Sequence, residues 1–438
     1  MTRRYSLSLL LAAFILTGCG GGSSGSSLSA SGSGSGSSSG ASATNIAALT
    51  VGPGPAGTNG GTFNIPYASV TICQPGTSTC ATINDLLVDT GSSGVRILAS
   101  AVAAAGLTLP DMTDPNDSSN TIGECLPFVD GYTWGPLATA TIQIGGETAS
   151  STSINIIDDN GTYNPSVPTA CTTLTTNTSL NSITAFNANG VLGIGVFAQD
   201  CGSGCSDCVM DGGCTSQNDV YYSCNATSNT CTSTPIALTL QVGNPVIAFA
   251  TDNNGVILDL PAIASSGATS VSGSLIFGID TQSNNSLGSA TVLTTDFSGF
   301  FTSTFNGQAL GSSFIDSGSN ALFFADSSLT PCGSSAPESE FYCPASTQSL
   351  STVNQGHDAG GVPIGVTSTV SFQIANLNAI SGSEFAIDDV GGTAASSSGT
   401  DTLSDDFDFG LPFFYGRRVF TAVEGAAAGG NTGPFFAY

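Results

Sequence analysis

The fold of this chain is decided by the stretch Leu86-Leu87-Val88-Asp89-Thr90-Gly91-Ser92-Ser93-Gly94, called here the first motif. Its pattern returns in a second motif, Ser313-Phe314-Ile315-Asp316-Ser317-Gly318-Ser319-Asn320. In both motifs an apolar run leads into Asp, then Thr or Ser, Gly and Ser. One copy would be weak evidence, because Asp, Ser and Gly are ordinary turn residues. Two copies after strand-like runs, with their aspartates 316 − 89 = 227 positions apart, are far more specific.

The two motifs predict a pair of carboxyl groups held in contact. A buried strand carries Asp89 or Asp316 to the edge of a core, and Gly91 and Gly318 let two loops approach where a Cβ atom would clash. Hydroxyl groups beside each Asp can fix its orientation, and these are Thr90, Ser92, Ser317 and Ser319. Two carboxylates this close share one proton, so one acts as a base and the other as an acid. Such a pair can activate a water molecule and protonate a carbonyl group. Since the pair titrates as a unit, the two roles are not assigned to individual residues.

The composition excludes several other chemistries. The 438 residues include 5 Lys plus Arg, 31 Asp plus Glu and 1 His, which gives a net charge of −26. None of the basic residues is lysine, which removes Schiff-base chemistry and the phosphate-binding P-loop. So acidic a chain argues against nucleic-acid binding, because phosphate contacts need Lys or Arg. A single histidine cannot build a His-ligated cluster, and we expect no metal and no cofactor.

From about Phe63 onward, most of the chain has the sequence pattern of short strands. Runs of alternating or β-branched residues lie between Gly, Asn, Ser and Pro turns, as in residues 68–72, 86–88, 139–144 and 273–277. Few segments repeat with a period of 3.6 residues, and residues 99–107 are the best helix candidate. The sequence therefore predicts an all-β protein.

The N-terminus predicts export. Residues 1–18 hold Arg3 and Arg4, a short apolar run and small residues, as in a signal peptide, and the run is too short to span a bilayer. It ends in Leu-Thr-Gly before Cys19, which resembles the bacterial lipobox, so we expect Cys19 to be lipidated; ordinary cleavage near Cys19 is the alternative. Residues 19–44, almost only Gly, Ser and Ala after Cys19, then form a flexible tether. The predicted location is the bacterial cell envelope, at its periplasmic face or the cell surface, with membrane contact through the lipid alone.

The cysteines predict disulfides. Thirteen cysteines less Cys19 leave twelve, an even number that in an exported protein suggests up to six bonds. Cys73 and Cys80 bracket a short turn, Cys332 and Cys343 are another local pair, and Cys125 with Cys171 follow by elimination. Six more crowd into residues 201–231, and their pairing stays open: Cys201, Cys205, Cys208, Cys214, Cys224 and Cys231. A zinc or iron–sulfur site is the alternative to disulfide bonds for these six cysteines.

With these motifs, the chain resembles the pepsin-like aspartic proteases; it also resembles a bacterial family of exported lipoproteins whose function is not established. The protease resemblance implies an all-β, bilobal double β-barrel with the active-site cleft between the lobes. It places one Asp motif in an N-terminal lobe of residues 45–255, which carries a Cys-rich insertion at 200–231, and the other in a C-terminal lobe of residues 256–438. Further segments follow the family's order: residues 67–88, 189–195, 273–280, 409–414 and 418–423.

Two segments depart from the family pattern. Gly94-Val95-Arg96 stands where the family often has Asn-Leu-Trp. The family closes a tyrosine-bearing hairpin flap over its substrate, and residues 128–135 are expected to form it here. Phe128 occupies the tyrosine's position by a gapless count, while Tyr132 and Trp134 lie nearer the turn and are the substitutes. The alternative is that all three aromatic side chains are packing residues.

Arg96 and His357 are the basic residues that lie between the N-terminal segment and the late strands. Arg96 is expected to pair with Asp85 or another surface acid, with a carboxylate near the site as the alternative. His357 lies in a Gly-rich stretch that reads as an exposed loop, and it is given no role.

The resulting hypothesis is an aspartic endopeptidase with Asp89 and Asp316 as its dyad. It would be a monomer that hydrolyses a peptide or protein substrate in acidic to mildly acidic conditions. The near absence of basic groups fits work in acid, since few positive charges remain to repel one another when carboxylates protonate; adaptation to salt or solubility is the alternative. Because a fold does not fix a function, a catalytically inactive binding or surface protein on the same fold is the rival reading, and a structural envelope protein is a third.

Overall fold

The computed structural model describes residues 45–58, 62–128, 130–173, 178–202, 220–334, 338–380, 382–393 and 406–438. The predicted signal peptide, the lipidated Cys19 and the tether lie outside the described residues, as do Cys205, Cys208 and Cys214. These expectations stay predictions.

Strands dominate the described chain, so the all-β prediction is confirmed. The strands up to the Cys-rich region are β1 (Ile46–Val51), β2 (Pro66–Cys73), β3 (Cys80–Asp89), β4 (Ser93–Leu98), β5 (Thr113–Asp114), β6 (Asp117–Phe128), β7 (Gly131–Ile144), β8 (Glu147–Ile157), β9 (Gly190–Ile194), β10 (Tyr221–Asn225) and β11 (Thr230–Ser233). The later strands are β12 (Gly255–Leu260), β13 (Val271–Phe277), β14 (Val292–Thr294), β15 (Phe301–Phe305), β16 (Gln308–Ile315), β17 (Leu322–Phe324), β18 (Gln348–His357), β19 (Pro363–Ile374), β20 (Gly391–Gly392), β21 (Phe407–Phe409), β22 (Arg417–Ala422), β23 (Ala427–Ala428), β24 (Asn431–Thr432) and β25 (Phe435–Ala437).

The helices of the described residues are short. The α-helices are α1 (Ala99–Ala104), α2 (Thr169–Thr173) and α3 (Ile183–Phe186). The 3-10 helices are η1 (Leu238–Leu240), η2 (Pro245–Ala248), η3 (Glu338–Glu340), η4 (Leu377–Ala379) and η5 (Leu411–Phe414). The predicted helix at 99–107 exists but stops earlier, because Gly106 takes a φ of +71°, a left-handed conformation that ends a helix. Within the described residues, no helix is both long and apolar enough to cross a membrane.

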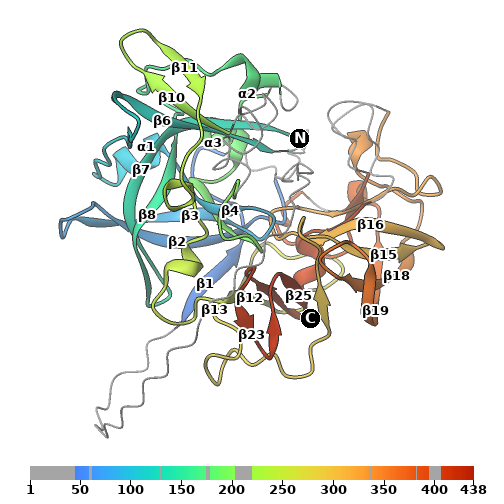
Figure 1. Ribbon diagram of the computed structural model, residues 1–438. Coiled ribbons are helices and arrows are strands. Elements are labelled where there is room, and N and C mark those ends of the chain that lie inside the picture. The colour runs from blue at the N-terminus through green and yellow to red at the C-terminus, as the bar shows by residue number, and fades with distance from the viewer. Residues whose placement is uncertain are drawn as a thin grey trace, which may run out of the picture.

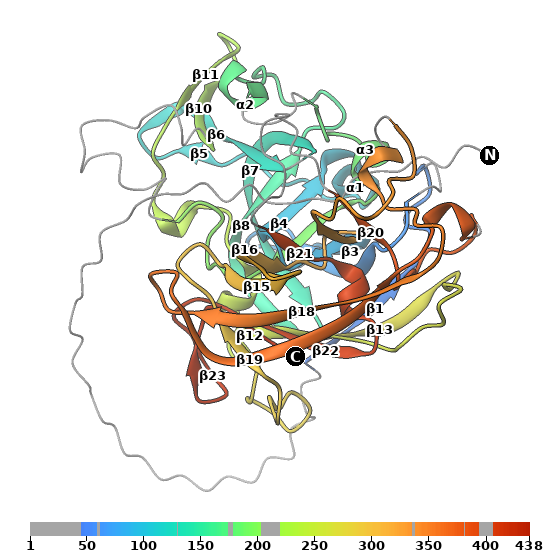
Figure 2. The same ribbon diagram turned by 90° about the vertical axis from the view of Figure 1, so that its right-hand side faces the viewer.

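The strands form two main sheets, visible as two groups in Figure 1. The larger, 16-stranded sheet runs in the order β11-β10-β6-β7-β8-β4-β9-β3-β2-β1-β13-β12-β22-β25-β14, with β5 beside β6. The second sheet has seven strands in the order β19-β18-β15-β16-β21-β17-β20, and Figure 2 shows its long β18 and β19 strands crossing one face. The first motif lies in the larger sheet and the second motif in the seven-stranded sheet.

The larger sheet continues across the predicted boundary between residues 255 and 256. Strand β1 pairs antiparallel with β13, from Ile46 opposite Ile276 to Val51 opposite Val271. Strand β12 begins at the boundary and pairs with β13 and β22. The division into lobes at this position stays a prediction.

The strands around the two motifs repeat one arrangement. β3 runs parallel to β9, β4 runs antiparallel to β9, and β4 runs parallel to β8. In the second sheet β16 runs parallel to β21, β17 runs antiparallel to β21, and β17 runs parallel to β20. Each Asp motif is therefore carried by the same strand pattern.

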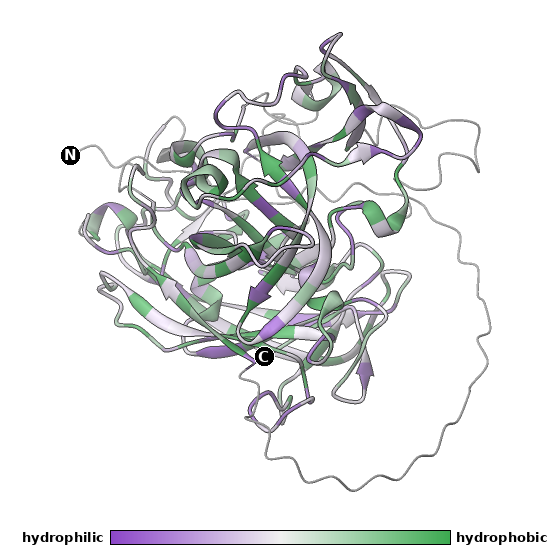
Figure 3. Cartoon of the chain, turned by 90° about the vertical axis from the view of Figure 1, so that its left-hand side faces the viewer, coloured by the Kyte–Doolittle hydropathy of each residue, from purple (hydrophilic) through white to green (hydrophobic). Residues whose placement is uncertain are grey.

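The core is built from strand residues of both sheets, and Figure 3 shows hydrophobic residues along the interior strands. In the seven-stranded sheet this core is rich in phenylalanine. Phe407 stacks on Phe324 with ring centroids 4.8 Å apart and on Phe409 at 4.3 Å. These buried rings pack β17 against β21. Since β21 also pairs with β16, they support the backbone behind the second motif.

Four disulfide bonds lie wholly within the described residues. Three are the predicted pairs, Cys73–Cys80, Cys125–Cys171 and Cys332–Cys343. The fourth, Cys224–Cys231, joins the β10–β11 hairpin of the Cys-rich segment, whose pairing the sequence left open. Cys201 is also disulfide-bonded. Disulfides indicate an oxidising compartment.

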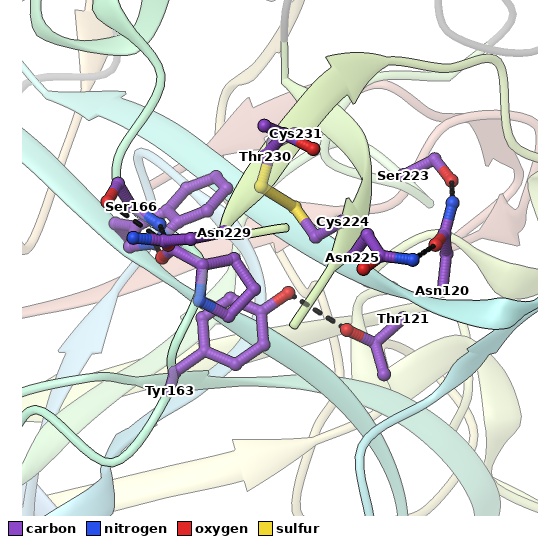
Figure 4. The surroundings of a disulfide bond; sticks show 12 residues. Asn120, Thr121, Tyr163, Ser166, Ser223, Cys224, Asn225, Asn229, Thr230 and Cys231 are labelled. Atoms are coloured by element: carbon purple, nitrogen blue, oxygen red, sulfur yellow. Dashed lines mark hydrogen bonds between the residues drawn. A yellow bond between two sulfur atoms is a disulfide. The ribbon is translucent and has the colours of Figure 1, made fainter. Parts of the chain in front are cut away.

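The Cys-rich segment is attached to the edge of the larger sheet. Strand β10 pairs antiparallel with β6. Figure 4 shows the side chain of Asn120 joined to Ser223 and Asn225 beside the Cys224–Cys231 bond, at 3.0 and 2.8 Å. This hairpin therefore extends the sheet at the end away from β14.

Two expectations about basic residues were wrong. Arg96 is fully buried and bonded to Glu124 and Asp200, which β6 and the chain before β10 bring to it, so it forms no pair with a surface acid. His357 is the last residue of β18 and only 3% exposed, with Nε2 at 2.6 Å from the Thr302 hydroxyl. The glycine-rich sequence around His357 masked a strand whose partner, β19, lies farther along the chain.

Candidate active site

The two motif aspartates lie at the ends of equivalent strands. Asp89 is the last residue of β3, opposite Gly193 of the parallel strand β9. Asp316 directly follows β16, and its backbone N–H donates to the carbonyl of Phe409 in β21 at 3.1 Å. The carboxyl end of one buried strand in each sheet thus delivers an aspartate to the same place.

The residues after the aspartates bind the two motifs together reciprocally. The Ser317 N–H donates to the Thr90 hydroxyl at 2.9 Å, and the Thr90 N–H donates to the Ser317 hydroxyl at 3.1 Å. The Thr90 hydroxyl in turn donates to the carbonyl of Ile315 at 3.3 Å, and the Ser317 hydroxyl donates to that of Val88 at 2.7 Å. All of these groups are buried, so they satisfy each other where water cannot.

The motif glycines are required by this contact. A Cβ atom on Gly91 would lie 2.6 Å from Cγ of Asp316, and one on Gly318 would lie 2.7 Å from Oδ1 of Asp89. Each glycine thus faces the carboxyl group of the opposite motif. Any other residue would push the two carboxyl groups apart.

Each carboxyl group is oriented from within its own motif. Oδ1 of Asp89 accepts the Gly91 N–H at 2.8 Å, and Oδ2 accepts the Ser92 hydroxyl. Oδ1 of Asp316 accepts the Gly318 N–H at 2.7 Å, and Oδ2 accepts the Ser319 hydroxyl at 3.0 Å. Of the predicted orienting hydroxyls, Ser92 and Ser319 therefore contact the aspartates directly. Thr90 and Ser317 bond the backbone of the opposite motif instead.

Burial and proximity make the pair hold a proton. Asp89 is 1% exposed and Asp316 is 0% exposed. Burial raises the pKa of Asp89, and hydrogen bonds from Asp316, Ser92 and Gly91 oppose that rise. Burial, then the charge of Asp89, raises the pKa of Asp316 well above its usual range. These surroundings favour a single proton shared by the pair, and they oppose the ionised form more strongly at Asp316 than at Asp89.

The sequence reasoning missed a third acid beside the pair. Asp408 in β21 is fully buried, and its charge adds to the rise in the pKa of Asp316. The only sequence signal was an acid between two aromatic residues, Phe407 and Phe409, where an apolar strand would have none.

A buried cation lies behind the first motif. Arg96 of β4 donates to Glu124 at 2.6 Å and to Asp200 at 2.9 Å, and its Nη1 donates to the carbonyl of Ser93 at 2.8 Å. Asp200 also accepts the Tyr221 hydroxyl at 2.6 Å. The charge of Arg96 opposes the burial-driven rise in the pKa of Asp89, so this network helps make the two aspartates unequal.

The predicted flap segment is a hairpin of β6 and β7, but its aromatic side chains are buried. Phe128 is 0% exposed and packs edge-on against Phe186 at 6.1 Å. Tyr132 and Trp134 lie in a cluster with Tyr163, and the Trp134 indole N–H donates to the carbonyl of Pro165 at 3.3 Å. These surroundings support the packing alternative; a contact of any of the three with substrate stays a prediction.

A separate pocket of about 250 Å³ lies between α1 and the end of β8. Val102, Leu107 and Ile156 are among its apolar lining, and Asp111 and Asp158 contribute carboxyl groups. Burial, then the charge of Asp158, raises the pKa of Asp111. The described residues contain no group of three or more His, Cys, Asp or Glu arranged to hold a metal ion.

Comparison with known proteins gives a family. A model described as a protein of unknown function (DUF3443) matches residues 41–438. The chain belongs to the DUF3443 family. No curated protein matches this DUF3443 chain. Among solved structures, an aspartic proteinase from Irpex lacteus is similar, with 16% sequence identity and a TM-score of 0.41 over 90% of this chain and 96% of that chain.

Proposed function

We propose that this DUF3443 protein is an aspartic endopeptidase whose dyad is Asp89 and Asp316. The observation that carries the proposal is the reciprocal contact of the two motifs, which holds two buried carboxyl groups together. Two carboxyl groups so placed would share one proton. Serine and threonine hydroxyls and backbone N–H groups orient both carboxyl groups in matching ways.

In this mechanism the ionised carboxyl group accepts a proton from a water molecule, which attacks the carbonyl carbon of a peptide bond. The protonated carboxyl group gives its proton to the carbonyl oxygen. As the C–N bond breaks, the leaving nitrogen takes the proton that the base carboxyl group accepted from water, and a hydroxyl group of the tetrahedral diol returns its proton to the other carboxylate as the C=O bond reforms. The dyad thus ends with one proton, as it began. The unequal surroundings favour Asp89 as the ionised member, because the charge of Arg96 acts on it and that of Asp408 acts on Asp316.

The cellular setting is part of the proposal. Export by the signal peptide, lipidation of Cys19 and a tether to residue 44 would hold a monomeric enzyme at the surface of an envelope membrane. The disulfides are consistent with that compartment. Its substrate would be a peptide or an unfolded protein.

A kinetic experiment tests the proposal. The full chain would be incubated with a mixture of synthetic peptides at acidic pH and cleavage followed by mass spectrometry. Replacing the proposed base, Asp89→Asn, should reduce cleavage by about 10²- to 10⁴-fold or more. Asp111→Asn is the matched control, since it also removes a partly buried acid but outside both motifs, and it should cleave like the parent. Equal cleavage by all three proteins would refute the dyad.

One observation favours a second function, that of a binding protein on the same fold. The two aspartates are almost inaccessible, and the three flap aromatics pack inside the protein instead of facing a ligand. Under this alternative, the folded parent binds a peptide from the mixture without cleaving it at any pH.

A further inference from the structure

The third acid of the site, Asp408, occupies a position built for an apolar residue. In the seven-stranded sheet it lies opposite Phe314 of β16 on one side and Phe323 of β17 on the other. Its side chain is completely buried. A charged carboxylate in such surroundings is costly unless it is paired, so its presence calls for an explanation.

The strand arrangement around the first motif has a position equivalent to that of Asp408, and the residue there can be compared with it. Phe314, two residues before Asp316, lies opposite Asp408. Leu87, two residues before Asp89, lies opposite Val191. Val191 is buried in the core and apolar, as strand packing requires. The acid is therefore specific to the second half of the site.

The polar neighbour of Asp408 is Ser319. The Ser319 hydroxyl interacts with the Asp408 carboxyl group, yet its one hydrogen is directed at Oδ2 of Asp316, 3.0 Å away. Neither oxygen of Asp408 accepts a hydrogen bond of regular geometry. A hydroxyl group that already donates its hydrogen can still accept a hydrogen bond through its oxygen. If Asp408 is the donor, the hydrogen-bonding groups of both Asp408 and Ser319 have partners.

The charges around Asp408 also favour its neutral form. β16 and β17 present phenylalanines to it, the two motif loops present Asp316 and Asp89, and its own segment presents Asp406. All of these titratable groups are acids. Burial is the main cause that raises the pKa of Asp408 well above its usual range; a hydrogen bond donated by Ser319 would oppose that rise, and the charges of Asp406 and Asp89 add to it.

We propose that Asp408 is a protonated carboxyl group that donates to the Ser319 hydroxyl and so completes a chain, Asp408–Ser319–Asp316, that holds the Ser319 hydrogen on Oδ2 of Asp316. Asp408 is then a positioning residue: it fixes the direction of the Ser319 hydrogen and acts on Asp316 through it. This inference rests on the proposed function for its kinetic consequence, but its structural content does not need the protein to be active.

The kinetic consequence concerns the basic limb of the pH–activity profile. Asp408→Asn exchanges one neutral donor to Ser319 for another, so the pH at which activity is lost should stay as in the parent. If Asp408 is instead ionised, the same change removes a negative charge beside Asp316, the pKa of Asp316 falls, and the limb moves down by about 1 unit or more. The control Asp406→Asn removes a neighbouring acid outside the Asp408–Ser319–Asp316 chain and should leave the limb nearly unchanged. A downward shift of the limb in Asp408→Asn overturns the inference.

A second measurement needs neither activity nor a variant. In an atomic-resolution crystal structure of the full chain at mildly acidic pH, a protonated Asp408 has one long and one short C–O bond, with the longer bond toward Ser319. Two equal bonds show an ionised carboxylate and overturn the inference. If this structure shows unequal bonds while no peptide is cleaved, the proposed function fails and the assignment of the Asp408 proton stands.

Discussion

Two glycines set the distance between the two motif aspartates. Gly91 and Gly318 face the opposite carboxyl groups at distances that leave no room for a methyl group. At residue scale this explains why a Gly recurs at the same place in both motifs. The reason lies in the close approach of the opposite carboxyl group, since neither glycine has a positive φ.

Replacing one of these glycines should therefore damage both stability and activity. Gly91→Ala forces its methyl group against Asp316, and overpacking of this kind costs about 1–3 kcal/mol of unfolding free energy. Denaturant unfolding measures the loss. Gly52→Ala is the control, because its new Cβ would find its nearest neighbour at 3.9 Å. If both variants unfold like the parent, the motifs do not touch as described.

At the level of single residues, the sequence predicted the part of the site that is encoded by a repeated motif. The repeated Asp-Thr/Ser-Gly-Ser pattern sufficed for the contact between Asp89 and Asp316. It did not suffice for Arg96, whose acid partners lie 28 and 104 residues away in the chain. The repeated motif also did not predict the role of Asp408. A single acid between aromatic residues does not indicate which loop lies next to it in the folded protein.

At the scale of elements, the joint between the two sheets is a set of four reciprocal hydrogen bonds. Thr90 and Ser317 each donate and accept across the joint. Because β3 and β16 end there, the joint positions both strands and hence both carboxyl groups. Its symmetry follows from the repeated pairing of the strands around each motif.

Breaking this joint should cost stability cooperatively. Thr90→Ala or Ser317→Ala leaves a buried N–H without its acceptor, a loss of about 1–3 kcal/mol each. The two changes remove different bonds of one joint, and losing either pair loosens the geometry that the other pair needs, so the combined loss in the double variant should be smaller than the sum. Thr71→Ala removes an exposed hydroxyl pair with Thr82 at 2.8 Å and should change stability by less than about 0.5 kcal/mol. Strict additivity of the two losses in chemical denaturation would contradict the reciprocal joint.

Elements with a clear local sequence pattern could be predicted, but the packing partners of their side chains could not. The strands at 68–72, 86–88, 139–144 and 273–277 all lie within observed strands. The flap hairpin was also expected, but the side to which Phe128 and Trp134 turn depends on packing against Phe186 and Tyr222, which no local pattern reveals.

At the scale of the whole molecule, several acids among the described residues have raised pKa values. Burial is the largest cause of the rise in each of the following: Asp89, Asp130, Asp200, Asp316 and Asp408. For Asp130, at the end of the β6–β7 hairpin, the pKa rises to about 7. The folded protein therefore holds protons that the unfolded chain has already released above about pH 4.

The sign of the resulting pH dependence is fixed. Where the native state binds more protons than the unfolded state, the free energy of unfolding falls as pH rises. Each such proton contributes a slope of about 1.4 kcal/mol per pH unit between its two pKa values. We expect the urea midpoint to be higher at about pH 4.5 than at about pH 7.5. Asp130→Asn should remove part of this dependence, and a midpoint that rises with pH would show that these acids are ionised in the folded protein.

The central claim, that Asp89 and Asp316 form a working dyad, is tested most directly by protein cleavage. The full chain and its Asp316→Asn variant, both shown to be folded with disulfides formed, would be incubated with an unfolded protein between about pH 3 and about pH 7. The account predicts fragments from the parent in the acidic part of this range and none from the variant. Cleavage by both, or by neither, would contradict it.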